Sequence, residues 1–94
     1  MKSIITDKKE CWVCGDTQHL HEHHIFFGTG KRQISEREGL KVWLCPKHHN
    51  FSKEAVHFNP ELDKELKILG ETTWCEKNDK TPEDFIELMG KNYL

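Results

Sequence analysis

The sequence predicts a small α+β domain, and three observations support that fold class. Residues 20–27 and 40–44 have the short alternating or β-branched pattern of strands, whereas helix-start signals precede three later segments. Cysteine and histidine pairs at metal-ligand spacing stand close to both strand segments. With 94 residues, 35% hydrophobic and 32% charged, the chain has little apolar core, so a structural metal ion would supply stability that the core lacks.

The two strand segments differ in clarity. Residues 20–27 alternate only partly, and the glycines of residues 28–30 end the pattern. Residues 31–38 read as a polar loop containing at most one turn of helix. Gly39 then precedes residues 40–44, the clearest strand in the chain, because alternation coincides with Val42 and Trp43.

Helix-start signals occur at three places in the second half of the chain. Pro46 suits the first turn of a helix because it has no N–H to satisfy there, so residues 47–56 are expected to be helical. Asn59 caps a second helix, which Gly70 weakens or interrupts, and Thr81 opens a third with an acid three residues on. The inward faces of the last two helices are expected to carry Leu62, Leu66, Leu69, Thr73 or Trp74, Phe85, Leu88 and Met89.

Two knuckles have the spacing that points two ligands at a single ion. Cys11 and Cys14 form one, and Cys45 and His48 form the other. Three thiolates and one imidazole are a normal tetrahedral set for structural Zn²⁺. Cys75 competes for the fourth place, but it stands outside any knuckle, and a free buried cysteine explains it more simply. A redox dithiol is the other alternative, although the βαβ pattern that usually surrounds one is missing from this sequence.

The N-terminus and the cysteines indicate a reducing compartment. The first seven residues are polar apart from two isoleucines after Ser3, and they lack the apolar run of a secretory signal. No stretch approaches the roughly 20 apolar residues of a membrane span. We therefore expect a cytoplasmic protein with metal-bound thiolates and no membrane partner.

Charge is distributed unevenly along the chain. Residues 25–53 carry six basic side chains against two acidic ones, a net charge of +4, whereas residues 54–94 carry ten acids against five lysines, a net charge of −5. The basic segment also contains His48 and His49 and directly follows the His23-His24 pair. Such a local patch could attract phosphates, although solvated surface charge explains any single lysine as readily.

Four histidines form a second candidate cluster once the zinc set is closed. They are His23, His24, His49 and His57. Adjacent histidines on a strand point to opposite faces, so His23 and His24 cannot bind one ion from regular geometry. The two histidines can have different roles, one as a ligand of a metal ion and the other as a group that holds a proton.

Taken together, these motifs resemble a known family. Cys-x-x-Cys, then His-His-Ile, then a strand ending in Leu-Cys-x-x-His-His is similar to the small phage-type HNH endonucleases, the His-Me finger proteins with a zinc-stapled, treble-clef-like ββα-metal core. The resemblance covers residues 11–57, and the two C-terminal helices, ending in Gly-Lys-Asn-Tyr-Leu, also look like the tail of such proteins. It implies a single HNH-like domain over residues 1–94, with its core at 11–57 and a helical extension at 59–94.

The resemblance implies hydrolysis of DNA phosphodiester bonds by an endonuclease or nickase. His24 would be the general base, while His23 and His49 would bind a catalytic divalent ion such as Mg²⁺ or Mn²⁺. His57 is eight residues from His49, about 12 Å in one continuous helix, so either the helix ends early or only one of the two binds. We favour His49, with His57 as a third ligand or a phosphate contact.

DNA is the partner that the resemblance implies. Phosphates would be contacted without sequence readout by Lys31, Arg32, Arg37, Lys41 and Lys53. A homodimer and a larger phage protein complex both stay open, because a domain this small seldom makes a highly specific nuclease alone.

One departure from the family pattern keeps a second function open. The motif's central Asn, which orients the base, has no counterpart in residues 35–39, so either a backbone carbonyl orients His24 or the ring is poorly oriented. The alternative is a non-catalytic zinc-stapled module that binds nucleic acid or protein through a degenerate HNH site.

Overall fold

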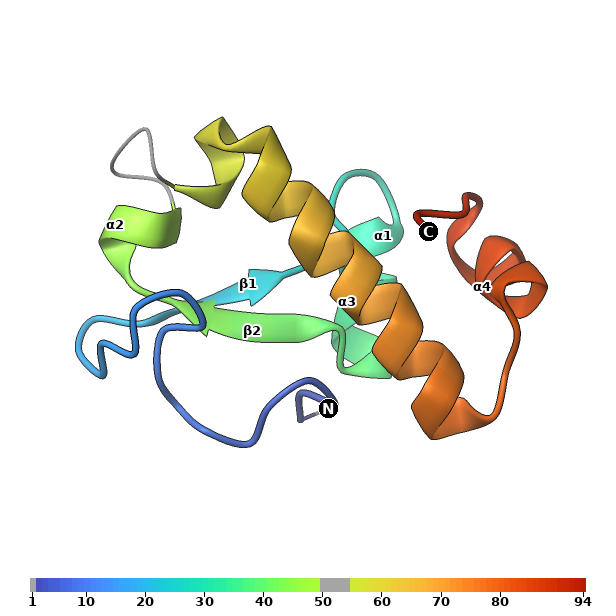
Figure 1. Cartoon of the computed structure of the whole chain (residues 1–94), viewed down its shortest axis with the longest axis horizontal. Coiled ribbons are helices and arrows are strands. Elements are labelled where there is room, and N and C mark those ends of the chain that lie inside the picture. Colours follow the sequence, from blue (N-terminus) through green and yellow to red (C-terminus); the bar gives the residue numbers. More distant parts are fainter. Residues whose placement is uncertain (1, 50–54) are drawn as a thin grey trace.

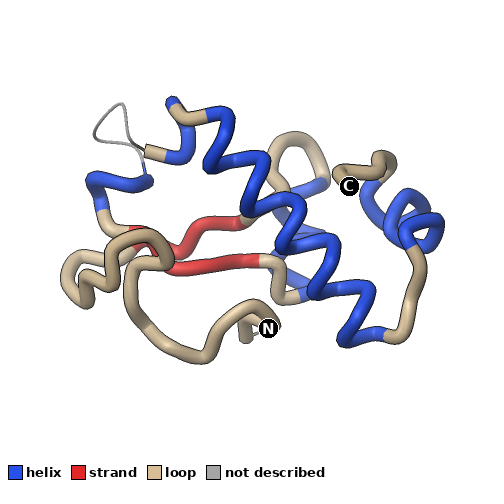
Figure 2. The backbone as a smooth tube through the Cα atoms, viewed as in Figure 1, coloured by secondary structure: helices blue, strands red, loops and turns tan. Residues whose placement is uncertain are grey.

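The structure is a computed structural model that describes residues 2–49 and 55–94. It is a small α+β domain, as predicted, in which one antiparallel strand pair is followed by helices (Figures 1 and 2). The element order is β1 (His21–His24), α1 (Lys31–Glu38), β2 (Lys41–Leu44), α2 (Pro46–His49), the 3-10 turn η1 (Val56–Phe58), α3 (Pro60–Asn78) and α4 (Pro82–Met89).

The register of the strand pair decides which side chains share a face. His23 of β1 lies opposite Val42 of β2, and His24 lies opposite Lys41. Because residues directly opposite each other in an antiparallel pair share a face, and successive residues alternate, His23 and His24 point to opposite sides of the sheet. Val42 is buried, so the face that carries His23 is the core face.

Helix α1 corrects the expectation of a polar loop at residues 31–38. The segment forms eight residues of α-helix, with left-handed glycines at both ends. Its one fully buried polar side chain, Ser35, accepts a hydrogen bond from the backbone N–H of Phe26 and donates one to the Phe26 carbonyl. This tertiary attachment, rather than a strong apolar stripe, stabilises the helix. Gly39 is required where α1 ends, because φ is +74° and a Cβ would lie 2.5 Å from the Lys2 carbonyl oxygen.

Helix α3 runs without a break through Gly70, so the predicted interruption is wrong. The Asn59 side chain accepts from the Leu62 N–H, and the helix continues for 19 residues (Figure 1). At Gly70 a Cβ would lie 3.0 Å from the ring of Phe26. The glycine therefore permits close approach of the helix to the segment after β1.

Helix α4 confirms its predicted signals. Thr81 and Asp84 form a capping box, and Gly90 ends the helix in the left-handed conformation. Its buried residues, Phe85 and Met89, are both on the predicted inward face. On α3, Leu66 and Trp74 are buried, and partly buried side chains complete the two faces at Leu62, Leu69 and Leu88.

The helix expected at residues 47–56 is confirmed only at its start. Pro46 begins α2, which extends to His49, and residues 50–54 lie outside the described part of the chain. From Val56 the chain forms the short turn η1 instead of α-helix. Within the described residues, no helix combines the length and the hydropathy that crossing a membrane would need.

Candidate functional site

The two predicted knuckles come together in one Cys₃His cluster. One ligand atom from each of Cys11, Cys14, Cys45 and His48 lies within 4.8 Å of the other three. The Cys14 and Cys45 sulfurs are 3.7 Å apart, and His48 Nδ1 lies 3.2 Å from the Cys45 sulfur and 3.7 Å from that of Cys11. Tetrahedral zinc bonds of about 2.3 Å to sulfur and 2.0 Å to nitrogen require such separations, about 3.5–3.8 Å. The cluster is consistent with structural Zn²⁺.

Short-range backbone bonds build this cluster. The Gly15 N–H donates to the Cys11 carbonyl and the Cys11 N–H to the Asp16 carbonyl, which closes the first knuckle. The Trp12 N–H donates to the Trp43 carbonyl and so fixes that knuckle against β2. Cys45 directly follows β2, and its carbonyl accepts from the His48 N–H in the first turn of α2.

The thiols of the first knuckle respond differently to their surroundings. Burial raises the pKa of Cys11. Hydrogen bonds from the backbone of Cys45, Cys14 and Val13 lower it, and together they outweigh burial, so the pKa is lowered to about 6. At Cys14 a backbone bond from Asp16 lowers the pKa, and desolvation with the neighbouring cysteines raises it above its ordinary value. A cation among these sulfurs would relieve that mutual repulsion.

Cys75 lies on α3 and does not belong to the cluster. Its pKa is raised, first by burial and then by acidic neighbours that include Glu71 and Asp84. A thiol held protonated in this way is a poor metal ligand, in agreement with the preference for His48.

A second cluster brings together three imidazoles from three elements. They belong to His23 of β1, His49 of α2 and His57 of η1, and their ligand nitrogens lie within 4.8 Å of one another. The Nε2 atoms of His49 and His57 are 3.3 Å apart. His57 belongs to η1 and lies beside His49, so the two residues are not eight positions apart in one continuous helix. Sequence reasoning missed His21, whose Nδ1 is 2.8 Å from His49 Nδ1.

The chemistry of this cluster suits a cation. Burial lowers the pKa of His23 to about 3, with smaller contributions from His49 and His57. Burial, followed by His57 and His21, lowers that of His49 to about 4. Both rings are therefore neutral at physiological pH, with a lone pair free for a metal. His23 Nε2 is buried and has no hydrogen-bond partner among the described residues, and a bound ion would satisfy it.

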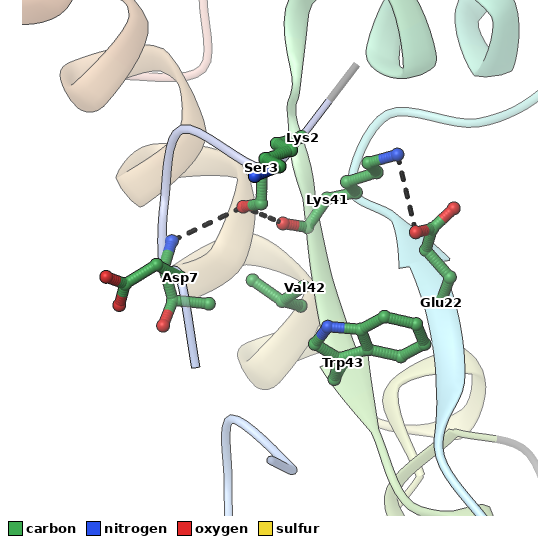
Figure 3. Close-up of a pocket in the computed structure, with 8 residues that line it drawn as sticks. Lys2, Ser3, Asp7, Glu22, Lys41, Val42 and Trp43 are labelled. Carbon is green, nitrogen blue, oxygen red and sulfur yellow. Dashed lines mark hydrogen bonds and ion pairs between the residues drawn. The ribbon is translucent and has the colours of Figure 1, made fainter. Parts of the chain in front are cut away.

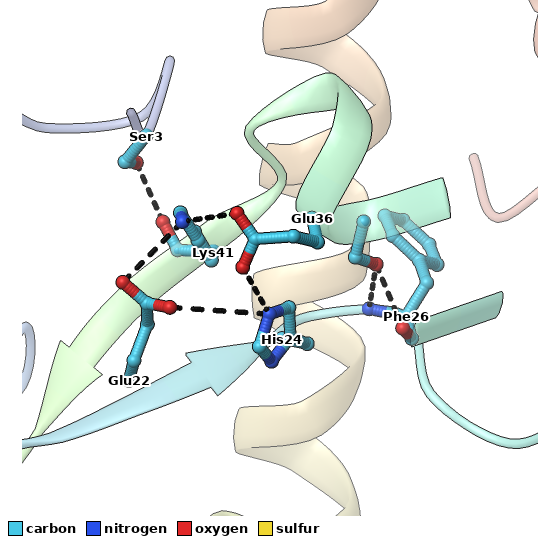
Figure 4. A network of polar contacts seen from close by, with 7 residues as sticks. Ser3, Glu22, His24, Phe26, Glu36 and Lys41 are labelled. Atoms are coloured by element: carbon cyan, nitrogen blue, oxygen red, sulfur yellow. Dashed lines mark hydrogen bonds and ion pairs between the residues drawn. The ribbon is translucent and has the colours of Figure 1, made fainter. Parts of the chain in front are cut away.

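His24 belongs to a separate polar network on the other face of the sheet (Figure 4). Its Nε2 lies 2.9 Å from Glu36 Oε1, and the second oxygen of Glu36 accepts from the Lys41 ammonium at 2.7 Å. Lys41 also lies 3.3 Å from Glu22. A carboxylate, rather than the expected backbone carbonyl, thus contacts the ring. Glu36 lies within residues 35–39, the segment that has no counterpart of the motif Asn.

One cavity joins the two histidine groups. It has a volume of about 210 Å³ and is lined by Glu22, His23, His24, Phe27, Arg32, His49 and His57. β1 is an edge strand of a two-stranded sheet, so a cavity can reach residues from both of its faces. No protein-family model, curated protein or solved structure matches the chain.

The five residues expected to contact phosphates have different surroundings. Arg32 is exposed at the cavity, and it also lines a groove of about 450 Å³ with Arg37, which is exposed and paired with Glu38. Lys31 Nζ lies 3.5 Å from the Tyr93 hydroxyl. Lys41 is buried and bound by two carboxylates, which speaks against its predicted phosphate contact. Lys53 lies outside the described residues.

Another cavity, of about 530 Å³, does not include the Cys₃His cluster or the three-histidine cluster (Figure 3). It lies between the N-terminal segment and the outer face of the sheet, where Glu22, Lys41 and Trp43 line it. The Ser3 hydroxyl donates to the Lys41 carbonyl and holds the segment there. The N-terminal segment covers Lys41, which lies beside His24. Its effect on the site is therefore structural.

Proposed function

We propose that this protein is a metal-dependent DNA endonuclease or nickase of the HNH type, with a zinc-stapled ββα-metal core at residues 11–57 and a helical extension at 59–94. The observation that carries the proposal is the 210 Å³ cavity, which three clustered imidazoles share with His24 from the opposite face of β1. Hydrolysis of a phosphodiester needs a proton acceptor for water and a cation beside the phosphate. This cavity offers candidates for both.

The residues divide these tasks. His24 takes a proton from the attacking water, and His23, His49 and His57 hold the divalent ion. When bound, that ion would stabilise charge on the scissile phosphate and on the leaving oxygen. Three protein ligands leave a tetrahedral site one position short, the arrangement typical of catalytic metals.

The donor set refines the metal that we expect. All three ligands are neutral imidazole nitrogens, which suit Zn²⁺, Ni²⁺ and similar transition ions, whereas Mg²⁺ prefers oxygen. We therefore expect cleavage to be supported by a transition ion better than by Mg²⁺, in contrast to the first expectation from the sequence.

Arginines on α1 are the best-placed phosphate contacts in this proposal. Arg32 lines both the cavity and the adjoining groove, and Arg37 lies further along that groove. A DNA strand following the groove past His24 would place one phosphate in the cavity and its neighbour against the helix. Lys31 and Lys53 stay predicted contacts, as does assembly into a homodimer or a larger phage complex.

Nicking of supercoiled plasmid tests the proposal. The wild-type protein is assayed with Zn²⁺, Ni²⁺, Co²⁺, Mn²⁺ and Mg²⁺, beside His24→Ala and the matched control His19→Asn. His19 is exposed, lies outside both metal clusters and has φ of +54°, which Asn tolerates. The proposal expects nicking by wild type and His19→Asn, and its loss in His24→Ala. Absence of nicking with every ion would refute it.

A zinc-stapled binding module is the second candidate. It is favoured by the missing motif Asn and by two exposed apolar side chains, Trp12 and Val13, on the first zinc knuckle. Aromatic side chains held out by a rigid turn are suited to stacking or protein contact. This candidate predicts DNA or protein binding that Trp12→Ala weakens, with no cleavage under any metal.

A further inference from the structure

The network around His24 contains a carboxylate that holds two partners at once. Glu36 Oε1 lies 2.9 Å from His24 Nε2, while Glu36 Oε2 lies 2.7 Å from the Lys41 ammonium (Figure 4). Glu22 is a weaker partner of the ring, at 4.0 Å. The His24 side chain is 10% exposed, so few other orientations of the ring are open to it.

The backbone fixes the distance between Glu36 and His24. Ser35, next to Glu36, exchanges two hydrogen bonds with Phe26, which is two residues after His24. These bonds attach helix α1 to the segment that follows β1. The next side chain of the helix, Glu36, points toward the imidazole ring of His24. The Glu36 side chain is itself 44% exposed, and its ion pair with the buried Lys41 ammonium holds it toward the ring.

A third metal ion does not explain this group well. Glu22, His24 and Glu36 do place three ligand atoms near one another. However, the buried ammonium of Lys41 already lies 3.3 Å from Glu22 and 2.7 Å from Glu36 and offsets part of their negative charge. The pKa of Glu36 is lowered, first by its bond to Lys41 and then by His24, so the group is a carboxylate.

A carboxylate can only accept hydrogen bonds, and this determines the state of the ring. His24 Nε2 must donate its hydrogen to Glu36, and in a neutral imidazole the other nitrogen is then an acceptor. Figure 4 shows that second nitrogen directed away from Glu36. We propose that Glu36 is a positioning residue that holds His24 with hydrogen on Nε2, leaving Nδ1 free to take the proton of water. The inference rests on the proposed function and assigns to Glu36 the orienting task of the missing Asn.

The sharpest test is Glu36→Gln, because it keeps the size of the side chain. Lys41 still requires an acceptor, so the amide oxygen turns to Lys41 and the amide NH₂ faces His24. Nε2 must then accept, and the ring hydrogen moves to Nδ1. We expect the tautomer of His24 to invert, and kcat for nicking to fall about 100-fold with KM for DNA unchanged, within the range for loss of a general base.

Two readouts are needed, both on the zinc-loaded chain. Nitrogen-15 NMR of the His24 ring reports the tautomer, and plasmid nicking reports kcat and KM. Glu36→Ala removes the acceptor and should give a mixture of tautomers, whereas Glu87→Gln, an exposed carboxamide change on α4, should match wild type in both assays. Zinc content and circular dichroism verify that each variant is folded.

The outcomes separate the two proposals. Wild-type tautomer and kcat in Glu36→Gln would overturn the role of Glu36 while nicking still supported the proposed function. If no variant cleaves, the proposed function fails. The NMR measurement then still decides whether Glu36 fixes the ring, since an inverted tautomer supports positioning and an unchanged one refutes it.

Discussion

The two candidate metal clusters of this protein differ in how their ligands are brought together. The Cys₃His cluster takes its four ligands from two turns, each a pair three residues apart, and a tetrahedral ion there has no position left for water. The three-histidine cluster takes one ligand from each of three elements, ranging from buried His23 to exposed His57, and opens into a cavity. A ligand cluster that fills every coordination position can stabilise the fold, whereas a cluster that leaves a position open to the cavity can also take part in a reaction.

Removal of the structural ion should have the largest effect. A structural zinc contributes on the order of 10 kcal/mol in small domains, comparable with the entire net stability of about 5–14 kcal/mol expected for 94 residues. Chelation, or Cys45→Ser, should therefore abolish cooperative unfolding in circular-dichroism melts. Cys75→Ser is the matched control, and it should keep one zinc per chain and lose about 1 kcal/mol. A demetallated protein with an unchanged melting transition would contradict the role given to the Cys₃His cluster.

Loss of a ligand from the open cluster should affect activity much more than stability. His23→Gln should lower nicking by about 100-fold or more, because even outer-shell partners of a metal contribute 10–100-fold. The bound transition metal, counted by mass spectrometry, should fall by one ion per chain while the first zinc stays. His57→Ala should have a smaller effect, because His57 is exposed and at the rim. Equal metal content in His23→Gln and wild type would remove His23 from the site.

The contrast between ligands from one turn and ligands from separate elements also explains which features could be predicted from the sequence. The zinc ligands and the caps of α3 and α4 follow from spacings of three residues, which local backbone geometry turns directly into contacts. The tie between Glu36 and His24 could not be read, because α1 has no strong apolar stripe and depends on the buried bond from Ser35 to Phe26. Similarly, His57 could be placed only once the structure showed it in η1 beside His49.

The attachment of α1 gives an intermediate effect. Ser35→Ala leaves the buried N–H and carbonyl of Phe26 without their side-chain partner, which costs about 1–3 kcal/mol. Urea unfolding of the zinc-loaded protein measures this loss. Because Ser35 also places Glu36, the variant should lower kcat while both metals stay bound. A loss of stability without any change in kcat would show that His24 is oriented independently of α1.

The smallest expected effect distinguishes the clusters by pH. The pKa of His23 is lowered to about 3 in the folded protein, against an ordinary value near 6.5 when unfolded. Below pH 6.5 His23 therefore binds a proton in the unfolded chain but stays neutral in the folded chain. The free energy of unfolding consequently falls as pH falls towards 3. Between pH 7 and 5.5 this costs about 1.3 kcal/mol in protein carrying only the structural zinc. His23→Gln should flatten the slope by that amount, whereas acid release of zinc from the thiolates would act on both proteins alike. Parallel urea titrations of the two proteins across this pH range would expose an error, because identical slopes would mean that His23 is solvated.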